Sequence, residues 1–227
     1  MAVPAGDRPH VRPDAVFQRV ALDETSWVDV ARGWLAGADD LFASLRDSVA
    51  WQTSRLFRYD HWVEERRLVA AWRTPRPLPH PALGEIHRSL QLRYRVRFEG
   101  FSLIQYRDGR DGQAFHRDTD MRWLDDTVIA ILSLGARRPW LLRPKTARYA
   151  QAPDRGATHD LAPGAGDLIV MGGRTQADWE HSVPYLTRQP VGMRISIQWR
   201  HAARRGRPFQ GGPYGAPLTY DRERRRD

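Results

Sequence analysis

The 227-residue sequence predicts a mainly β fold of the α+β class, a sandwich or barrel with helices on one face. Two observations favour this class. After Arg66, short apolar runs suited to strands are separated by turn signals rich in Gly, Asp and Pro. Before Arg66, apolar residues recur at helical spacing. We expect a helical flank over residues 21–95 and a β core over about 96–203, together forming one domain.

Three stretches of the flank are expected to form helices. The first begins at Ser26, which with Asp29 resembles a capping box, and it ends at Gly37. The second covers residues 39–49 and the third residues 81–92. Each places its apolar residues on one helical face, which indicates packing against a core.

Seven apolar runs predict the strands of the core: RLVAAW (67–72), FSLIQY (101–106), QAFHRD (113–118), TVIAILSL (127–134), PWLLRP (139–144), DLIVMG (167–172) and MRISIQW (193–199). Turn signals lie between them, among them DGRDG (108–112), GARRP (135–139) and APGAG (162–166).

The two ends of the chain differ from the core in composition. Residues 1–20 lack the apolar segment of a secretory signal, so we expect a disordered arm. Residues 204–227, rich in Arg, Gly and Pro, are expected to be extended. No run approaches the roughly 18 apolar residues of a membrane span. We therefore expect a cytoplasmic protein that does not associate with membranes. A monomer is expected as well, although no sequence feature specifies the oligomeric state.

The charge balance favours a polyanionic partner, nucleic acid first. The chain carries 36 Lys and Arg against 27 Asp and Glu, a formal net charge of +9. Nearly all the cations are Arg, with Lys145 the only lysine, a pattern that codon bias in a GC-rich genome also produces. Charge supports nucleic-acid binding without establishing it.

The stretch FHRDTD (115–120) places an imidazole and two carboxylates at alternate positions. In a strand, His116, Asp118 and Asp120 would share one face, either as a solvated edge or as part of a metal site. The chain has no cysteine, so a metal would need His, Asp or Glu ligands. Among the other histidines, His181 stands out because it follows a strand and a glycine turn. Two imidazoles and one carboxylate suit non-haem Fe(II), and zinc hydrolases use a similar trio.

The strand MRISIQWR (193–200) favours iron together with an acidic co-substrate. Its alternation separates an apolar face from a polar face that carries Arg194, Ser196, Gln198 and Arg200. Two guanidinium groups on one face can each form a forked pair with one end of a dicarboxylate. Surface arginines on an exposed strand are the other interpretation.

In this order, the motifs resemble the AlkB-type Fe(II)/2-oxoglutarate-dependent dioxygenases, which remove alkyl groups from nucleic acids and have a double-stranded β-helix (jelly-roll) fold. The resemblance runs from Arg66 to Arg200 and rests on YRDG (106–109), HRDTD (116–120), SLGARRPWLLRPK (133–145), GDLIVMGG (166–173), WEH (179–181) and the Arg194–Arg200 pair. It implies that His116, Asp118 and His181 bind Fe(II). It also implies that Arg194 binds the distal carboxylate of 2-oxoglutarate and that Arg200 contacts its metal-side carboxylate.

The resemblance further assigns Tyr106 to hydrogen bonding with 2-oxoglutarate and Asp120 to a position near the target base. Trp72 lies where the family carries a substrate-gripping lid, and Trp123 and Trp179 are other aromatic residues available to stack on a base, although a packing role suits each of the three. The family usually has Asn where this chain has Ile104. Gln105 and Gln198 are the candidates to replace that hydrogen bond, whose loss would weaken co-substrate binding by less than about tenfold.

The implied reaction is oxidative demethylation of an N-alkylated base, which releases formaldehyde, succinate and CO2 and requires a single-stranded or flipped-out base. The resemblance leaves DNA and RNA both open as the strand. A related dioxygenase that acts on a protein or a small molecule is the alternative, and it would lack salt-dependent affinity for single-stranded DNA. A nucleic-acid-binding module with a decayed site is a third hypothesis, which the complete set of ligands disfavours.

Overall fold

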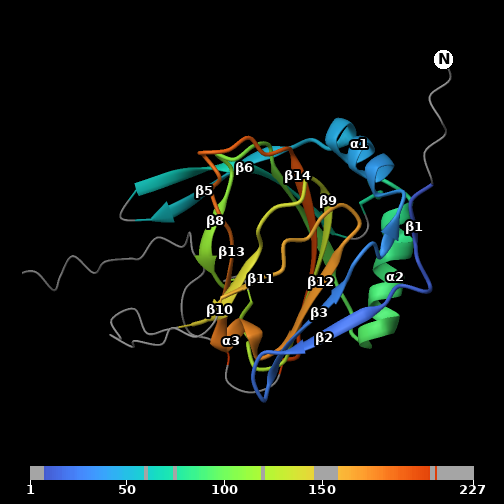
Figure 1. The fold of residues 1–227 in the computed structure, drawn as a ribbon, viewed down its shortest axis with the longest axis vertical. Helices are drawn as coiled ribbons and strands as arrows, with labels where there is room; N and C mark the ends of the chain where they lie inside the picture. The colour runs from blue at the N-terminus through green and yellow to red at the C-terminus, as the bar shows by residue number, and fades with distance from the viewer. Residues whose placement is uncertain are drawn as a thin grey trace, which may run out of the picture.

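Two antiparallel sheets form the core of the protein (Figure 1). The computed structural model describes residues 8–58, 61–73, 76–118, 121–145, 158–204 and 208. The major sheet has eight strands in the order β2 (Phe17–Ala21), β3 (Ser26–Ala31), β12 (Leu168–Gly173), β9 (Thr127–Gly135), β14 (Arg194–Ala202), β7 (Gly100–Tyr106), β6 (His61–Arg73) and β5 (Gln52–Arg58). The minor sheet has four, in the order β11 (His159–Asp160), β10 (Leu141–Pro144), β13 (Trp179–Val183) and β8 (Gln113–His116). The remaining elements are the β1 (His10–Val11) and β4 (Leu35–Ala36) pair and the helices α1 (Ala38–Ser48), α2 (Ala82–Tyr94) and α3 (Thr175–Asp178).

The major sheet separates two apolar layers. Helices α1 and α2 cover its outer face, and the minor sheet lies against its inner face (Figure 1). Along β9, Ala130 and Leu132 belong to the helix-side layer, while Ile129 and Ile131 belong to the interior between the sheets. Because both faces of the major sheet are covered, the sequence of β9 is apolar almost without interruption. A polar residue that points into this interior therefore calls for an explanation.

The mainly β class with flanking helices is confirmed. Helices α1 and α2 form where two of the three helical stripes were predicted, with Leu41 and Leu45 of α1 and Leu83 and Ile86 of α2 fully buried. All seven predicted runs contain strands: β6, β7, β8, β9, β10, β12 and β14.

The helix predicted from Ser26 to Gly37 is wrong, because the segment contains strand β3 instead. It lies between β2 and β12, so both of its faces are covered. Val28 and Val30 point into the interior between the sheets, whereas Ala31 belongs to the helix-side layer. Burial on both faces makes a strand apolar at spacings that also fit a helix, and the two valines favour the strand.

Two further expectations need correction. The disordered arm was predicted to cover residues 1–20, but residues 10–11 form β1 and residues 17–21 form β2. The flank over residues 21–95 was expected to be helical, yet it also contributes β3, β5 and β6 to the major sheet. β3 pairs with β12 and β6 with β7, so these strands have partners that are distant in the sequence, whereas β2 and β5 form hairpins with β3 and β6 at the two edges of the sheet. The predicted extended tail lies outside the described residues from 209 onward.

Within the described part of the chain, no helix has both the length and the apolar character needed to cross a membrane.

Candidate active site

Three potential metal ligands converge at one edge of the minor sheet. His116 ends β8 and His181 lies in β13, and the two residues are direct partners across this antiparallel pair. Their ring centroids are 4.3 Å apart. Asp118 follows two residues after His116, and the ligand atoms of the three side chains all lie within 4.8 Å of one another. The structure thus brings together three of the predicted site residues.

The protonation states of this triad suit a metal. His116 Nδ1 lies 2.8 Å from the carbonyl oxygen of Ala114, which favours a proton on Nδ1 and leaves Nε2 free to bind a metal. Burial, followed by the charge of His116, lowers the pKa of His181 to about 3. Burial opposes ionisation of Asp118, but Arg200 and the histidines outweigh it and hold the pKa of Asp118 well below its ordinary range. At neutral pH the site offers two neutral imidazoles and a carboxylate, the forms that ligate metals.

The metal-free protein is expected to lose stability as the pH falls below about 6.5. The unfolded chain protonates His181 near its ordinary pKa of 6.5, whereas the folded protein resists this until about 3. The free energy of unfolding therefore has its full value above pH 6.5 and falls by up to about 1.4 kcal/mol per pH unit below it. Urea midpoints measured from pH 7 to pH 5 should fall less steeply for His181→Gln than for the natural protein. Parallel profiles would contradict this assignment.

Arg194 is a fully buried guanidinium with unused donors. Its Nη2 donates to Ser133 Oγ at 3.0 Å, but Nε and Nη1 have no hydrogen-bond partner among the described residues. Burial lowers its pKa to about 10, so the group is charged at neutral pH. A buried cation without a counter-charge is costly, and an anionic ligand with two acceptor atoms would satisfy it.

Tyr106 lies beside Arg194, as its direct partner across β7 and β14. The guanidinium carbon of Arg194 is 6.0 Å from the centre of the Tyr106 ring. Burial raises the pKa of Tyr106, so the hydroxyl keeps its proton at neutral pH and can donate to an anion.

Arg200 contacts the triad directly. Its Nε donates to Asp118 Oδ2 at 2.8 Å, and Nη1 donates to Ser102 Oγ at 2.9 Å. Nη2 also donates to Gln198 Oε1. The apolar face of β14, with Ile195, Ile197 and Trp199, belongs to the helix-side layer, so the arginines occupy the interior face. β14 thus lines an internal site and is not an exposed strand.

A family model described as the 2OG-Fe(II) oxygenase superfamily matches residues 36–200. The chain belongs to this superfamily. Alpha-ketoglutarate-dependent dioxygenase alkB homolog 3 of Bos taurus is 28% identical over 180 residues, which cover 73% of this chain and 62% of that protein. DNA oxidative demethylase ALKBH2 of Homo sapiens is 27% identical over 180 residues, covering 73% of this chain and 69% of that protein. The chain is an AlkB-type member of the superfamily, and it spans about 62% of the length of the first of these relatives.

Solved structures share the fold. A prolyl hydroxylase from Trichoplax adhaerens, in complex with a hypoxia-inducible factor peptide, superposes with a TM-score of 0.55 at 13% identity, covering 76% of this chain and 82% of that chain. OsALKBH1 superposes with a TM-score of 0.54 at 10% identity, covering 81% of this chain and 100% of that chain. These likenesses confirm the predicted jelly-roll core.

The residues of this oxygenase site fit the two groups for which the superfamily is named. The triad offers the donor set that non-haem Fe(II) prefers. The unpaired donors of Arg194 offer a site for one carboxylate of 2-oxoglutarate. Both lie in the interior between the sheets, where water is largely excluded.

The position of Ile104 in this AlkB-type chain is filled by packing. Ile104 belongs to the apolar interior beside Tyr106. Of the two predicted replacements for the family's usual Asn, Gln105 alternates with Ile104 and so points toward the helices, whereas Gln198 lies on the interior face and binds Arg200. Gln198 is therefore the better placed of the two.

Each of the three aromatic residues named as a candidate to stack on a base has a packing contact within the protein. Trp72 belongs to the helix-side layer, stacks on Phe101 with ring centroids 6.1 Å apart, and donates from Nε1 to the carbonyl oxygen of Pro77. Trp179 is buried and donates to Asp23 Oδ2 at 2.6 Å. Trp123 packs near Arg204. Asp120 lies outside the described residues, so its role stays a prediction.

Arg67 is a site residue that the sequence interpretation missed. It is the neighbour of Tyr106 across β6 and β7, on the side away from Arg194, because Leu68 pairs with Gln105. It forms an ion pair with Glu65 at 2.9 Å, both side chains being 13% exposed. Its charge lowers the pKa of both histidines, which places it near the triad. Its alternation with Glu65 and Val69 along the strand is the signal that could have identified it.

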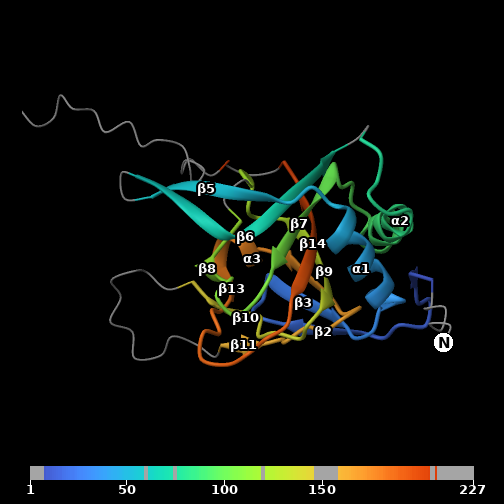
Figure 2. The same cartoon turned by 90° about the horizontal axis from the view of Figure 1, so that it is seen from above.

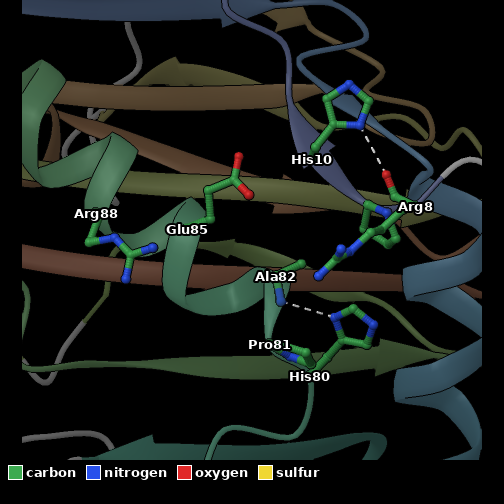
Figure 3. A pocket seen from close by; sticks show the side chains of 8 residues that line it. Arg8, His10, His80, Pro81, Ala82, Glu85 and Arg88 are labelled. Carbon is green, nitrogen blue, oxygen red and sulfur yellow. Dashed lines mark hydrogen bonds between the residues drawn. The ribbon is translucent and has the colours of Figure 1, made fainter.

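A separate cavity of about 580 Å³ lies at the start of α2, on the helix side of the major sheet (Figure 3). Arg8, His10, His80, Glu85 and Arg88 are among its lining residues. Glu85 Oε1 already accepts from the backbone N–H of Val11 at 3.1 Å. None of the predicted site residues lines this cavity.

Proposed function

We propose that this chain is an Fe(II)/2-oxoglutarate-dependent dioxygenase that demethylates N-alkylated bases in nucleic acid. The observation that carries the proposal is the pairing of a His-Asp-His triad with a buried, unsatisfied guanidinium on the facing strands of one interior. The names of its relatives, a DNA oxidative demethylase among them, and the net charge of +9 support a nucleic-acid substrate.

The site residues would have different roles, in binding the metal and in binding the co-substrate. His116, Asp118 and His181 would hold Fe(II). Arg194 would bind the distal carboxylate of 2-oxoglutarate. When bound, iron and 2-oxoglutarate supply the oxidising chemistry that uses O2 to hydroxylate the alkyl carbon, with loss of formaldehyde and formation of succinate and CO2.

The remaining groups would orient co-substrate and base. Tyr106 keeps its proton and would donate it in a hydrogen bond to 2-oxoglutarate. Arg200 would exchange part of its contact with Asp118 for the metal-side carboxylate of the co-substrate. Arg67 adds positive charge to the same interior.

The approach of the base is suggested by the β5–β6 hairpin. In both views the hairpin projects past the other strands of the major sheet on the side where β8 lies (Figures 1 and 2). A single-stranded or flipped base could approach the triad from this side, and Asp120 remains predicted to lie near the target base.

Coupled product formation tests the proposal. The protein, Fe(II) and 2-oxoglutarate are incubated with a single-stranded oligonucleotide that carries one N-methylated base, and succinate and demethylated oligonucleotide are measured by mass spectrometry. We expect both products in equal amounts, dependent on iron. Succinate without demethylation would move the substrate to a protein, a small molecule or another lesion. Neither product from iron-loaded protein would overturn the enzyme assignment.

A further inference from the structure

Asp118 is the one member of the triad that lies outside a strand. His116 and His181 are fixed by the hydrogen bonds of the β8–β13 pair. Asp118 follows the end of β8. The described residues between β8 and β9, 117–118 and 121–126, form neither strand nor helix. Its position must therefore come from side-chain contacts.

Among the described residues, the side chains of Arg200 and Gln176 form hydrogen bonds with Asp118, and they bind different atoms of it. Arg200 binds the carboxylate, with Nε 2.8 Å from Oδ2. Gln176 binds the backbone, because its Oε1 accepts the N–H of Asp118 at 2.8 Å. The arginine occupies oxygens that a metal would need. The glutamine leaves both oxygens available.

Gln176 is suited to this role by its burial and its place in the chain. Its side chain is 1% exposed, and Asp118 is 8% exposed, so their hydrogen bond is shielded from water. A buried N–H that loses its acceptor is destabilised, which favours displacement of a short irregular segment toward water. Gln176 belongs to α3, which leads directly into β13 and His181. One amide thus links the strand of one ligand to the backbone of another.

The residue before α3 contacts the other end of the segment that joins β8 to β9. Arg174, which precedes α3, forms an ion pair with Asp125 and a second with Asp178 at 2.9 Å. The backbone N–H of Arg174 donates to the carbonyl oxygen of Thr25 at 3.2 Å, which ties the start of the helix to the loop before β3. Gln176 and Arg174 therefore fasten the Asp118 segment at both ends to one anchored turn.

We propose that Gln176 is a positioning residue for the metal centre, fixing the backbone of Asp118 so that its carboxylate faces both histidines. The inference rests on the proposed metal site and adds a residue to it. Gln176 does not itself contact the metal or the co-substrate. Its loss should weaken metal binding, because Asp118 would no longer be held in the ligating orientation.

The test compares two buried substitutions on the same helix. Gln176→Met keeps the length of the side chain and removes the acceptor. Thr175→Val is the matched control, because Thr175 is equally buried and its Oγ1 has no hydrogen-bond partner in the described structure. Metal-free proteins are titrated with Co(II), which reports both affinity and coordination through its visible absorption, and their thermal unfolding is measured without metal.

We expect Gln176→Met to raise the Co(II) dissociation constant by roughly 10-fold or more and to change the absorption spectrum. Thr175→Val should bind like the natural protein. Equal affinity and spectrum in Gln176→Met, with or without a lower unfolding temperature, would overturn the proposal. If the natural protein itself fails to bind Co(II), the metal site of the proposed function falls, and this inference falls with it.

A measurement on the natural protein covers the case in which Gln176→Met does not fold. Amide hydrogen exchange of the metal-free protein should show strong protection at Asp118, although this residue lies outside any strand. Exchange at the rate of an exposed, unbonded amide would overturn the proposal.

Discussion

Asp118→Asn is expected to reduce iron-dependent turnover of 2-oxoglutarate by more than about 100-fold. The substitution keeps the size of the side chain but removes the negative charge that both Fe(II) and Arg200 require. Iron content of the purified protein and succinate formation would be measured together. We expect Asp118→Asn to lose both its bound iron and its succinate formation.

Asp126→Asn is the matched control for this change. Asp126 is exposed and lies eight residues further along the chain, and its backbone carbonyl oxygen accepts a hydrogen bond from the N–H of Ala203 at 2.9 Å. It should keep full iron content and turnover. Full activity in Asp118→Asn with iron still bound would mean that the metal lies elsewhere.

Arg194→Met is expected to raise the KM for 2-oxoglutarate by about 10- to 100-fold, the value of charge-assisted hydrogen bonds to one carboxylate. Co(II) affinity should not change, because Arg194 has no contact with the triad among its described hydrogen bonds. The ligand-free protein should be as stable as before or more stable, since a buried cation with two unsatisfied donors is removed.

Three readouts separate this binding role from a structural one: KM, metal affinity and unfolding temperature. Arg88→Met, which removes an exposed arginine on α2, serves as the control and should leave all three unchanged. A large loss of stability in Arg194→Met with an unchanged KM would show that Arg194 supports the fold and does not bind the co-substrate.

The sequence predicted those parts of the site that depend on alternation within one strand. The polar face of β14 could be predicted because Arg194 and Arg200 are separated by an even number of positions and therefore point to the same side of the strand. The apolar residues at the alternate positions point to the opposite side, and this alternation does not depend on the details of packing. The helix predicted after Ser26 was wrong for a related reason. A strand covered on both faces has no polar face, so its period of two is hidden.

Contacts across long stretches of chain could not be predicted in this way. Gln176 meets Asp118 from 58 residues away, and nothing in the local pattern of either segment specifies that approach. Trp72 shows the same limit, because its position in the chain suggested a lid, whereas its side chain belongs to the helix-side layer and stacks on Phe101. The type of a residue within a motif predicts which chemical role it can have. The direction in which its side chain points depends on how the two sheets are assembled.

The facing positions of His116 and His181 on paired strands have a consequence for how this protein can evolve. Neighbouring residues on a strand point to opposite sides, so inserting or deleting one residue within β8 or β13 would turn a histidine outward without changing any amino acid of the motif. Such a change in strand length would disrupt the metal site even though every ligand residue is still present in the chain. We expect natural variation in chain length to be confined to the loops, with these two strands constant in length.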